Sequence, residues 1–184
     1  SNVTLASILT PFDPTGASPA TAVDTNDKSR ASLTCLGIVL LGKGDTGYHV
    51  SGISNENFSE IGQVSCIQDD CTLIKFDTSG TPRQLDFKEV NVGSTVPSFG
   101  PNDPNNCIGV EYNAASNESL TLNIGSLTND KAGTGNLGIW MRRGHMHFNG
   151  SEIMFLGQDA ILVDDGELDI DSSDITGDAT INAG

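Results

Sequence analysis

The segment GHMHFNGSEIMFLGQDAILVDDGELDIDSSDITGDATI, residues 144–181, decides the fold class because groups of alternating apolar and polar residues recur along it. These groups span residues 145–149, 152–156, 160–164, 167–171 and 178–182, and one begins about every eight or nine residues. Such alternation, punctuated by glycine, is typical of short strands with one face in water. The spacing fits a meander, the edge of a sandwich, or the rungs of a β-solenoid or intertwined fibre.

The composition of the whole chain agrees with a β protein. Charged residues make up 18% of the 184 residues and Gly occurs 21 times, so polarity comes mainly from small hydroxyl and amide side chains. Such residues suit turns and strand surfaces and form helices poorly. We therefore predict a mainly β fold: an antiparallel β-sandwich or barrel-like core, an extended N-terminal arm and a Gly-punctuated, β-rich C-terminal part.

Residues 1–32 are predicted to be the arm. A short apolar stretch is followed by Pro11, Pro14 and Pro19, which interrupt regular structure. The segment has too little apolar surface to fold alone, so we expect it to anchor the chain on a neighbour. The anchoring side chains would be Val3, Leu5, Ile8, Leu9 and Phe12.

The remaining chain divides at a loop rich in Pro and Asn, residues 97–107. Residues 33–96 are predicted to form the first part of the β domain, with 61–67 and 71–76 paired as a hairpin. Residues 108–184 are predicted to form its second part, or alternatively a separate fibre-like β region.

Charge restricts the partners. The formal net charge is −15, and the sequence pI is near 4.2. No basic stripe is available to neutralise phosphates, so binding to nucleic acid is not expected. No apolar run reaches the roughly 18 residues of a membrane span, so no span is expected either.

The chain has four cysteines, Cys35, Cys66, Cys71 and Cys107, which allow three pairings if all are oxidised. Cys66 and Cys71 could close a hairpin loop with a disulfide, whereas Cys35 is more simply a buried thiol. No CxxC pair occurs, so a zinc ribbon or thioredoxin motif is not supported.

The motif Gly144-His145-Met146-His147-Phe148 is the sharpest candidate for metal binding. On a strand, His145 and His147 share one face, and three chains around an axis would supply six imidazoles to a transition metal. The motif resembles the HxH elements of trimeric phage tail-fibre tips, which implies a metal on a threefold axis. The alternative is two histidines on a polar strand face without metal or other cofactor.

Trp140, Arg142 and Arg143 could form an interface or glycan patch, because Trp and Arg concentrate at interface hot spots. The alternative is a core Trp beside two surface arginines. The acids between Asp164 and Asp174 do not match a calcium loop, and a solvated strand face is favoured. No GxSxG or HExxH motif occurs, so we do not expect an enzyme.

The texture of the chain resembles bacteriophage capsid-decoration, head-fibre and tail-fibre proteins. This resemblance implies a non-enzymatic structural role in the virion, as a homotrimer or higher oligomer docked through the arm on a capsid or tail. One alternative is a secreted filament or adhesin subunit of the donor-strand type, located at the cell surface. Another is a carbohydrate-binding β domain that uses Trp140, Tyr48 or Tyr112 as stacking platforms.

Overall fold

The computed structural model describes residues 2–25, 32–51, 59–78, 85–93, 103–114, 119–129 and 133–181. Strands account for 74% of the chain and no helix is present in the described part, so the prediction of a mainly β protein is confirmed. Among these residues there is accordingly no helix that could cross a membrane.

The strands fall into an odd-numbered and an even-numbered series. The odd-numbered strands are β1 (Asn2–Leu9), β3 (Ser32–Leu40), β5 (Ser59–Cys66), β7 (Leu85–Val92), β9 (Ser119–Asn129) and β11 (His145–Val163). The even-numbered strands are β2 (Thr21–Thr25), β4 (Thr46–Ser51), β6 (Thr72–Thr78), β8 (Ile108–Ala114), β10 (Leu137–Arg143) and β12 (Glu167–Ile181).

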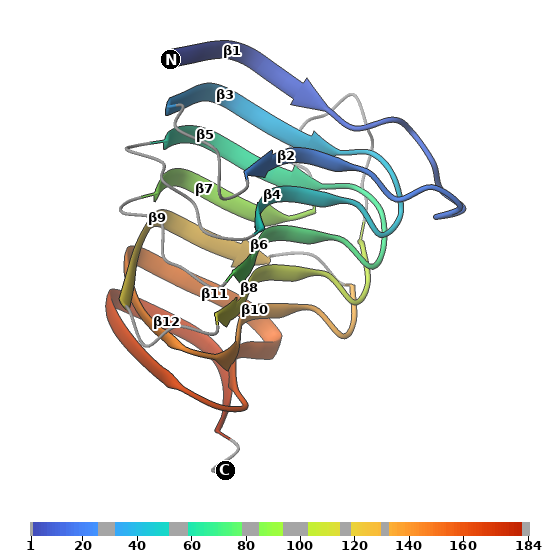
Figure 1. Cartoon of the computed structure of the whole chain (residues 1–184). Coiled ribbons are helices and arrows are strands. Elements are labelled where there is room, and N and C mark those ends of the chain that lie inside the picture. The colour runs from blue at the N-terminus through green and yellow to red at the C-terminus, as the bar shows by residue number, and fades with distance from the viewer. Residues whose placement is uncertain are drawn as a thin grey trace.

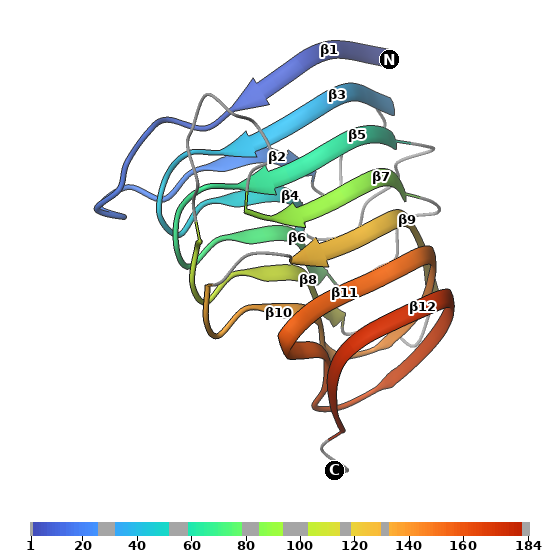
Figure 2. The same cartoon turned by 180° about the vertical axis from the view of Figure 1, so that it is seen from behind.

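The chain is a parallel β-solenoid of about five turns. From β1 to β10, each turn places one odd strand in one sheet and the following even strand in the other, and every pairing is parallel to the strand of the next turn (Figures 1 and 2). The long strand β11 pairs with β9 through its first half and with β10 through its second, and β12 lies along the whole of β11. The predicted antiparallel sandwich or barrel is therefore wrong.

The predicted hairpin of residues 61–67 and 71–76 is wrong for a local reason. After Cys66 the chain turns a corner into the other sheet, so β5 pairs with β3 and β7 while β6 pairs with β4 and β8. Asp70 adopts φ 62° within this corner, a left-handed conformation that Asp tolerates better than most residues. The polar turn signal was present, but it marks a corner of the solenoid.

The segment expected to be an extended arm contributes the first turn of the solenoid. β1 pairs with β3 and β2 pairs with β4. The β6–β8 and β7–β9 pairings join the two predicted parts of the β domain into one continuous stack. Of the Pro/Asn-rich loop, residues 103–107 lead directly into β8, and residues 97–102 lie outside the described part.

The core lies between the two sheets as columns of aligned apolar side chains. One column, called the isoleucine column here, runs through the odd strands β1 to β11 and ends in β12; it consists of Ile8, Ile38, Val64, Val90, Leu127, Ile153 and Ile175. A facing column runs through the even strands β2 to β10 and continues in the second halves of β11 and β12; it consists of Val23, Tyr48, Ile74, Val110, Ile139, Ile161 and Ala179. Because parallel strands stack in register and side chains alternate between faces, each core residue packs on the residue of the preceding turn.

Candidate functional site

The two ends of the solenoid expose core positions. In the described part of the chain, β1 pairs only with β3, and β12 pairs only with β11. Ile175, at the end of the isoleucine column, is 45% exposed, although Ile38, Val64, Val90, Leu127 and Ile153 in the same column are fully buried. At the other end Val3 and Leu5 are 43% and 41% exposed.

The uncovered residues at the two ends match in spacing. Successive pairings place Val3 in the column that ends at Ile170, and Leu5 in the column that ends at Ser172. Ile8 begins the isoleucine column, which ends at Ile175. A β1 strand laid on β12 in this register would continue all three columns, and two of them end in the apolar residues Ile170 and Ile175.

The ends differ in charge. β1 has the sequence NVTLASIL and carries no charged side chain. β12 carries Asp169, Asp171, Asp174 and Asp178, all of them exposed. Acids placed opposite acids destabilise a strand pair, so β12 is better suited to meet the neutral β1 than a second β12.

The five predicted arm residues occupy two kinds of position. Val3, Leu5 and Ile8 point into core columns of the first turn, and Ile8 packs against the core. Leu9 and Phe12 are 56% and 66% exposed, at the end of β1 and beyond it.

The histidines of the HxH motif lie on the outer side of β11. Met146 and Phe148 are fully buried, so His145 and His147 share the opposite face. His145 Nε2 lies 3.3 Å from Asp169 Oδ2 on β12. Glu167 joins these two residues in a group whose ligand atoms lie within 4.8 Å of one another, and His147 is not part of it.

Trp140 and Arg142 are held by neighbours on the outer face of the even sheet. Trp140 Nε1 donates a hydrogen bond to Asp164 Oδ2 at 2.7 Å, and the Arg142 guanidinium lies 4.7 Å from the centre of the indole ring. Arg142 Nη1 also lies 2.9 Å from Oε1 of the buried Glu111. One face of the indole is therefore already covered, and Arg143 is exposed.

The tyrosines considered as glycan platforms are core residues. Tyr48 and Tyr112 are both fully buried, so the prediction that they stack on an exposed sugar is wrong. Tyr48 packs edge-on against Phe87 with ring centres 5.6 Å apart, and Tyr112 packs against Phe76 at 5.4 Å.

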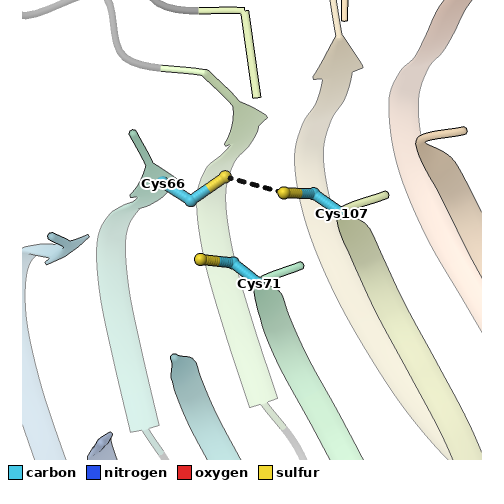
Figure 3. Close-up of side chains that lie close together, drawn as sticks. All are labelled: Cys66, Cys71 and Cys107. Carbon is cyan, nitrogen blue, oxygen red and sulfur yellow. Dashed lines mark hydrogen bonds between the residues drawn. The ribbon is translucent and has the colours of Figure 1, made fainter. Parts of the chain in front are cut away.

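Three cysteines converge at one corner of the solenoid. Cys66 ends β5, whereas Cys71 and Cys107 immediately precede β6 and β8; all three are fully buried. Their sulfur atoms lie within 4.8 Å of one another, and the Cys66 and Cys107 sulfurs are 3.7 Å apart (Figure 3). All four cysteines are free, so the structure contains no Cys66–Cys71 disulfide. The hairpin prediction linked Cys66 with Cys71 and did not include Cys107.

Two of these cysteines belong to a series that we call the corner ladder: Asp45, Cys71, Cys107, Asn136 and Gln158, one from each successive turn. Each occupies the position before the even-sheet pairing begins. Asn136 shows the principle: its Oδ1 accepts a hydrogen bond from Cys107 N at 2.8 Å, and its Nδ2 donates to Pro104 O at 2.9 Å. The side chain thus satisfies two buried backbone groups of the preceding turn.

In the corner ladder, the thiols of Cys71 and Cys107 contact the preceding turn in the same way as the amide of Asn136. Cys107 Sγ lies 3.3 Å from Gln68 O, and Cys71 Sγ lies 3.3 Å from Gly42 O. Gln68 lies three residues before Cys71, and Gly42 lies three residues before Asp45. Pro104 lies at the same distance before Cys107. Asp45 similarly accepts a hydrogen bond from Ala20 N at 2.8 Å.

The shared hydrogen bonds make the three thiols unequal. Hydrogen bonds from Cys107 and Cys66 lower the pKa of Cys71, because two donors stabilise its thiolate. Hydrogen bonding to Cys107 and Cys71, together with burial, raises the pKa of Cys66. The hydrogen bond with Cys66 lowers the pKa of Cys107, but the interaction with Cys71 and burial together have the larger effect. The pKa of Cys107 is therefore raised. Cys71 is therefore the thiol of this cluster whose pKa favours ionisation.

A polar hollow of about 310 Å³ lies beside the last rungs of the ladder. Its lining residues are Gly135, Asn136, Leu137, Gln158, Asp159 and Asp178. Neither a nucleophilic thiol nor a histidine is among them, and both carboxylates are exposed.

Comparison with known proteins finds no matching family model, curated protein or solved structure. The fold itself places the chain in the class of parallel β-solenoids.

Proposed function

We propose that this chain is a non-enzymatic structural protein that assembles end to end, with β1 of one copy stacking on β12 of the next. The observation that carries this proposal is the match between the two uncovered ends. Val3, Leu5 and Ile8 stand in the columns that end at Ile170, Ser172 and Ile175.

The driving force would be burial of apolar side chains that water now reaches. Fully burying one aliphatic side chain contributes about 1.5–3 kcal/mol, and Leu5 and Ile175 are each nearly half exposed. New backbone hydrogen bonds between the two edge strands would add directionality, as in other strand-addition interfaces.

The arrangement would be head-to-tail. A contact between two different surfaces of one molecule generates an open series of oligomers unless the rotation between copies closes a ring. The acids of β12 and the neutral β1 favour this arrangement over a tail-to-tail pair. The setting we propose is a bacteriophage fibre or decoration protein, in keeping with the texture of the sequence; a closed homotrimer is the competing arrangement.

Light scattering after size-exclusion chromatography, over a range of concentrations, tests the assembly. We expect a concentration-dependent series of masses for the native chain. Leu5→Lys and Ile175→Lys should each abolish the series, because each places a charge in the joint. Leu36→Lys is the matched control, since Leu36 is 73% exposed on the side of the stack and lies next to Cys35 on β3.

Mixing the two end variants sharpens the test. Leu5→Lys retains an intact β12 end, and Ile175→Lys retains an intact β1 end, so the mixture should give a discrete heterodimer. A native chain that is monomeric at all concentrations would contradict the proposal. A discrete trimer that survives both substitutions would support the closed arrangement instead.

A further inference from the structure

We propose that Cys66, Cys71 and Cys107 form a binding site for one thiophilic d¹⁰ metal ion, Cu(I) or Zn(II). Three sulfur atoms, contributed by two successive turns of the chain, lie within 4.8 Å of one another at a fully buried corner. Thiolate sulfur is the ligand that selects these ions over harder cations.

The distances fit a single ion. A metal–sulfur bond of about 2.3 Å places two sulfurs about 3.8 Å apart in tetrahedral geometry and about 4.0 Å apart in trigonal geometry. The Cys66 and Cys107 sulfurs are 3.7 Å apart without any ion. Little movement is therefore needed to close the three sulfurs around a metal.

Backbone bridging alone does not explain the choice of residue. At other turns a carboxylate or amide side chain makes the hydrogen bond to the backbone of the preceding turn, as in Asp45, Asn136 and Gln158. Thiols occupy the ladder only at the two turns that face Cys66. Cys66 itself lies on the other sheet, aligned with Leu40 and Val92, where an aliphatic side chain would serve the core equally well.

Charge also favours a cation. Three thiolates held this close together in a buried corner would repel one another unless a cation lay between them. Metal binding would displace the thiol protons, and the ion would neutralise the sulfurs that stay buried. Asp70 and Asn106, the residues immediately before Cys71 and Cys107, are exposed.

Anaerobic titration of the reduced full-length chain with Zn(II) and with Cu(I) tests the site, with a chromophoric chelator as competitor. We expect one equivalent of at least one of these ions to bind and to raise the melting temperature. Cys66→Val and Cys107→Asn should each lose this binding. Valine suits the aliphatic column of Cys66, and asparagine is the residue that the ladder uses at position 136.

Cys35→Val is the matched control, because Cys35 is also buried but lies in a core column with Ile61 and Phe87. It reduces the number of thiols equally and should leave the stoichiometry at one. Absence of binding by the native chain would overturn the proposal. Binding that persists in both folded cluster variants, or that disappears in Cys35→Val, would also overturn it, because the ion would then reside elsewhere.

Discussion

The central turns and the C-terminal turn use the same columns but differ in how completely the columns are covered. Leu127 in β9 and Ile175 in β12 belong to the isoleucine column. Leu127 is packed from both sides and is fully buried, whereas Ile175 has a neighbour on one side only and is 45% exposed. In a solenoid each turn contacts only its neighbours, so position along the axis decides how much an apolar side chain contributes.

The largest difference should appear between alanine substitutions in this one column. We expect Leu127→Ala to lower the unfolding free energy by about 2–5 kcal/mol, because it leaves a cavity between two turns. Ile175→Ala should cost less than about 1 kcal/mol in the monomer, because water already reaches this side chain. Urea denaturation at low protein concentration measures both. Equal losses of unfolding free energy would show that the end of the column is covered as completely as its centre.

Close contact between turns should give the next largest effect. A Cβ atom on Gly62 would overlap the carbonyl oxygen of Leu36 in the preceding turn, whereas one on Gly37 would lie 3.8 Å from Gln63 O. We expect Gly62→Ala to cost about 1–3 kcal/mol through overpacking. Gly37→Ala should be neutral or stabilise by up to about 1 kcal/mol, because alanine loses less conformational freedom on folding. The two melting temperatures provide the comparison, and a harmless Gly62→Ala would contradict the close stacking described here.

The corner ladder offers a smaller test. Cys107→Ala removes a side chain that reaches Gln68 O, while Cys107→Asn restores a group able to donate and accept, as Asn136 does. We expect the asparagine variant to be about 1 kcal/mol more stable than the alanine variant. Denaturation in the presence of a chelator isolates this effect from metal binding. An alanine variant as stable as the asparagine variant would show that the ladder does not require a polar rung.

The smallest effect is expected at Tyr112. Its buried hydroxyl has no hydrogen-bond partner in the described part of the protein, so Tyr112→Phe should be neutral or slightly stabilising near pH 7. Burial raises the pKa of Tyr112 to about 12, whereas an unfolded tyrosine ionises near pH 10. The unfolded state therefore loses this proton first, and native stability should fall as the pH rises from about 10 to about 12. In Tyr112→Phe this part of the decline should be absent; an identical decline in both proteins would argue against a buried neutral phenol.

The sequence was sufficient to predict strands but not their arrangement. The alternation after residue 144 corresponds to strands β11 and β12. The rungs of a β-solenoid were one of the arrangements that fitted the spacing after residue 144, but a parallel arrangement of the whole chain was not predicted, because connections of unequal length hide the repeat. Members of the isoleucine column are separated by 30, 26, 26, 37, 26 and 22 residues. Only the spacing within each strand is constant. The positions aligned with Val3, Leu5 and Ile8 keep the same separation in every odd strand.

The candidate sites show the same limit. His145 and His147 were predicted to share a face, and the buried Met146 and Phe148 on either side of His147 agree with that placement. Cys107 could not be connected with Cys66 because they are 41 residues apart and meet only through the stacking of turns. A signal was available, however, since both Cys71 and Cys107 immediately precede an apolar strand.

The parallel pairing of turns also determines how the molecule would carry mechanical load. Hydrogen bonds between neighbouring strands join one turn to the next, and in a solenoid that direction is the long axis. Tension between the two ends would load all hydrogen bonds at one turn boundary together, and side-chain columns would resist compression along the same axis. A rupture would separate whole turns, beginning where the fewest strands and core contacts hold, so extension under force should proceed in steps of one turn rather than by gradual stretching.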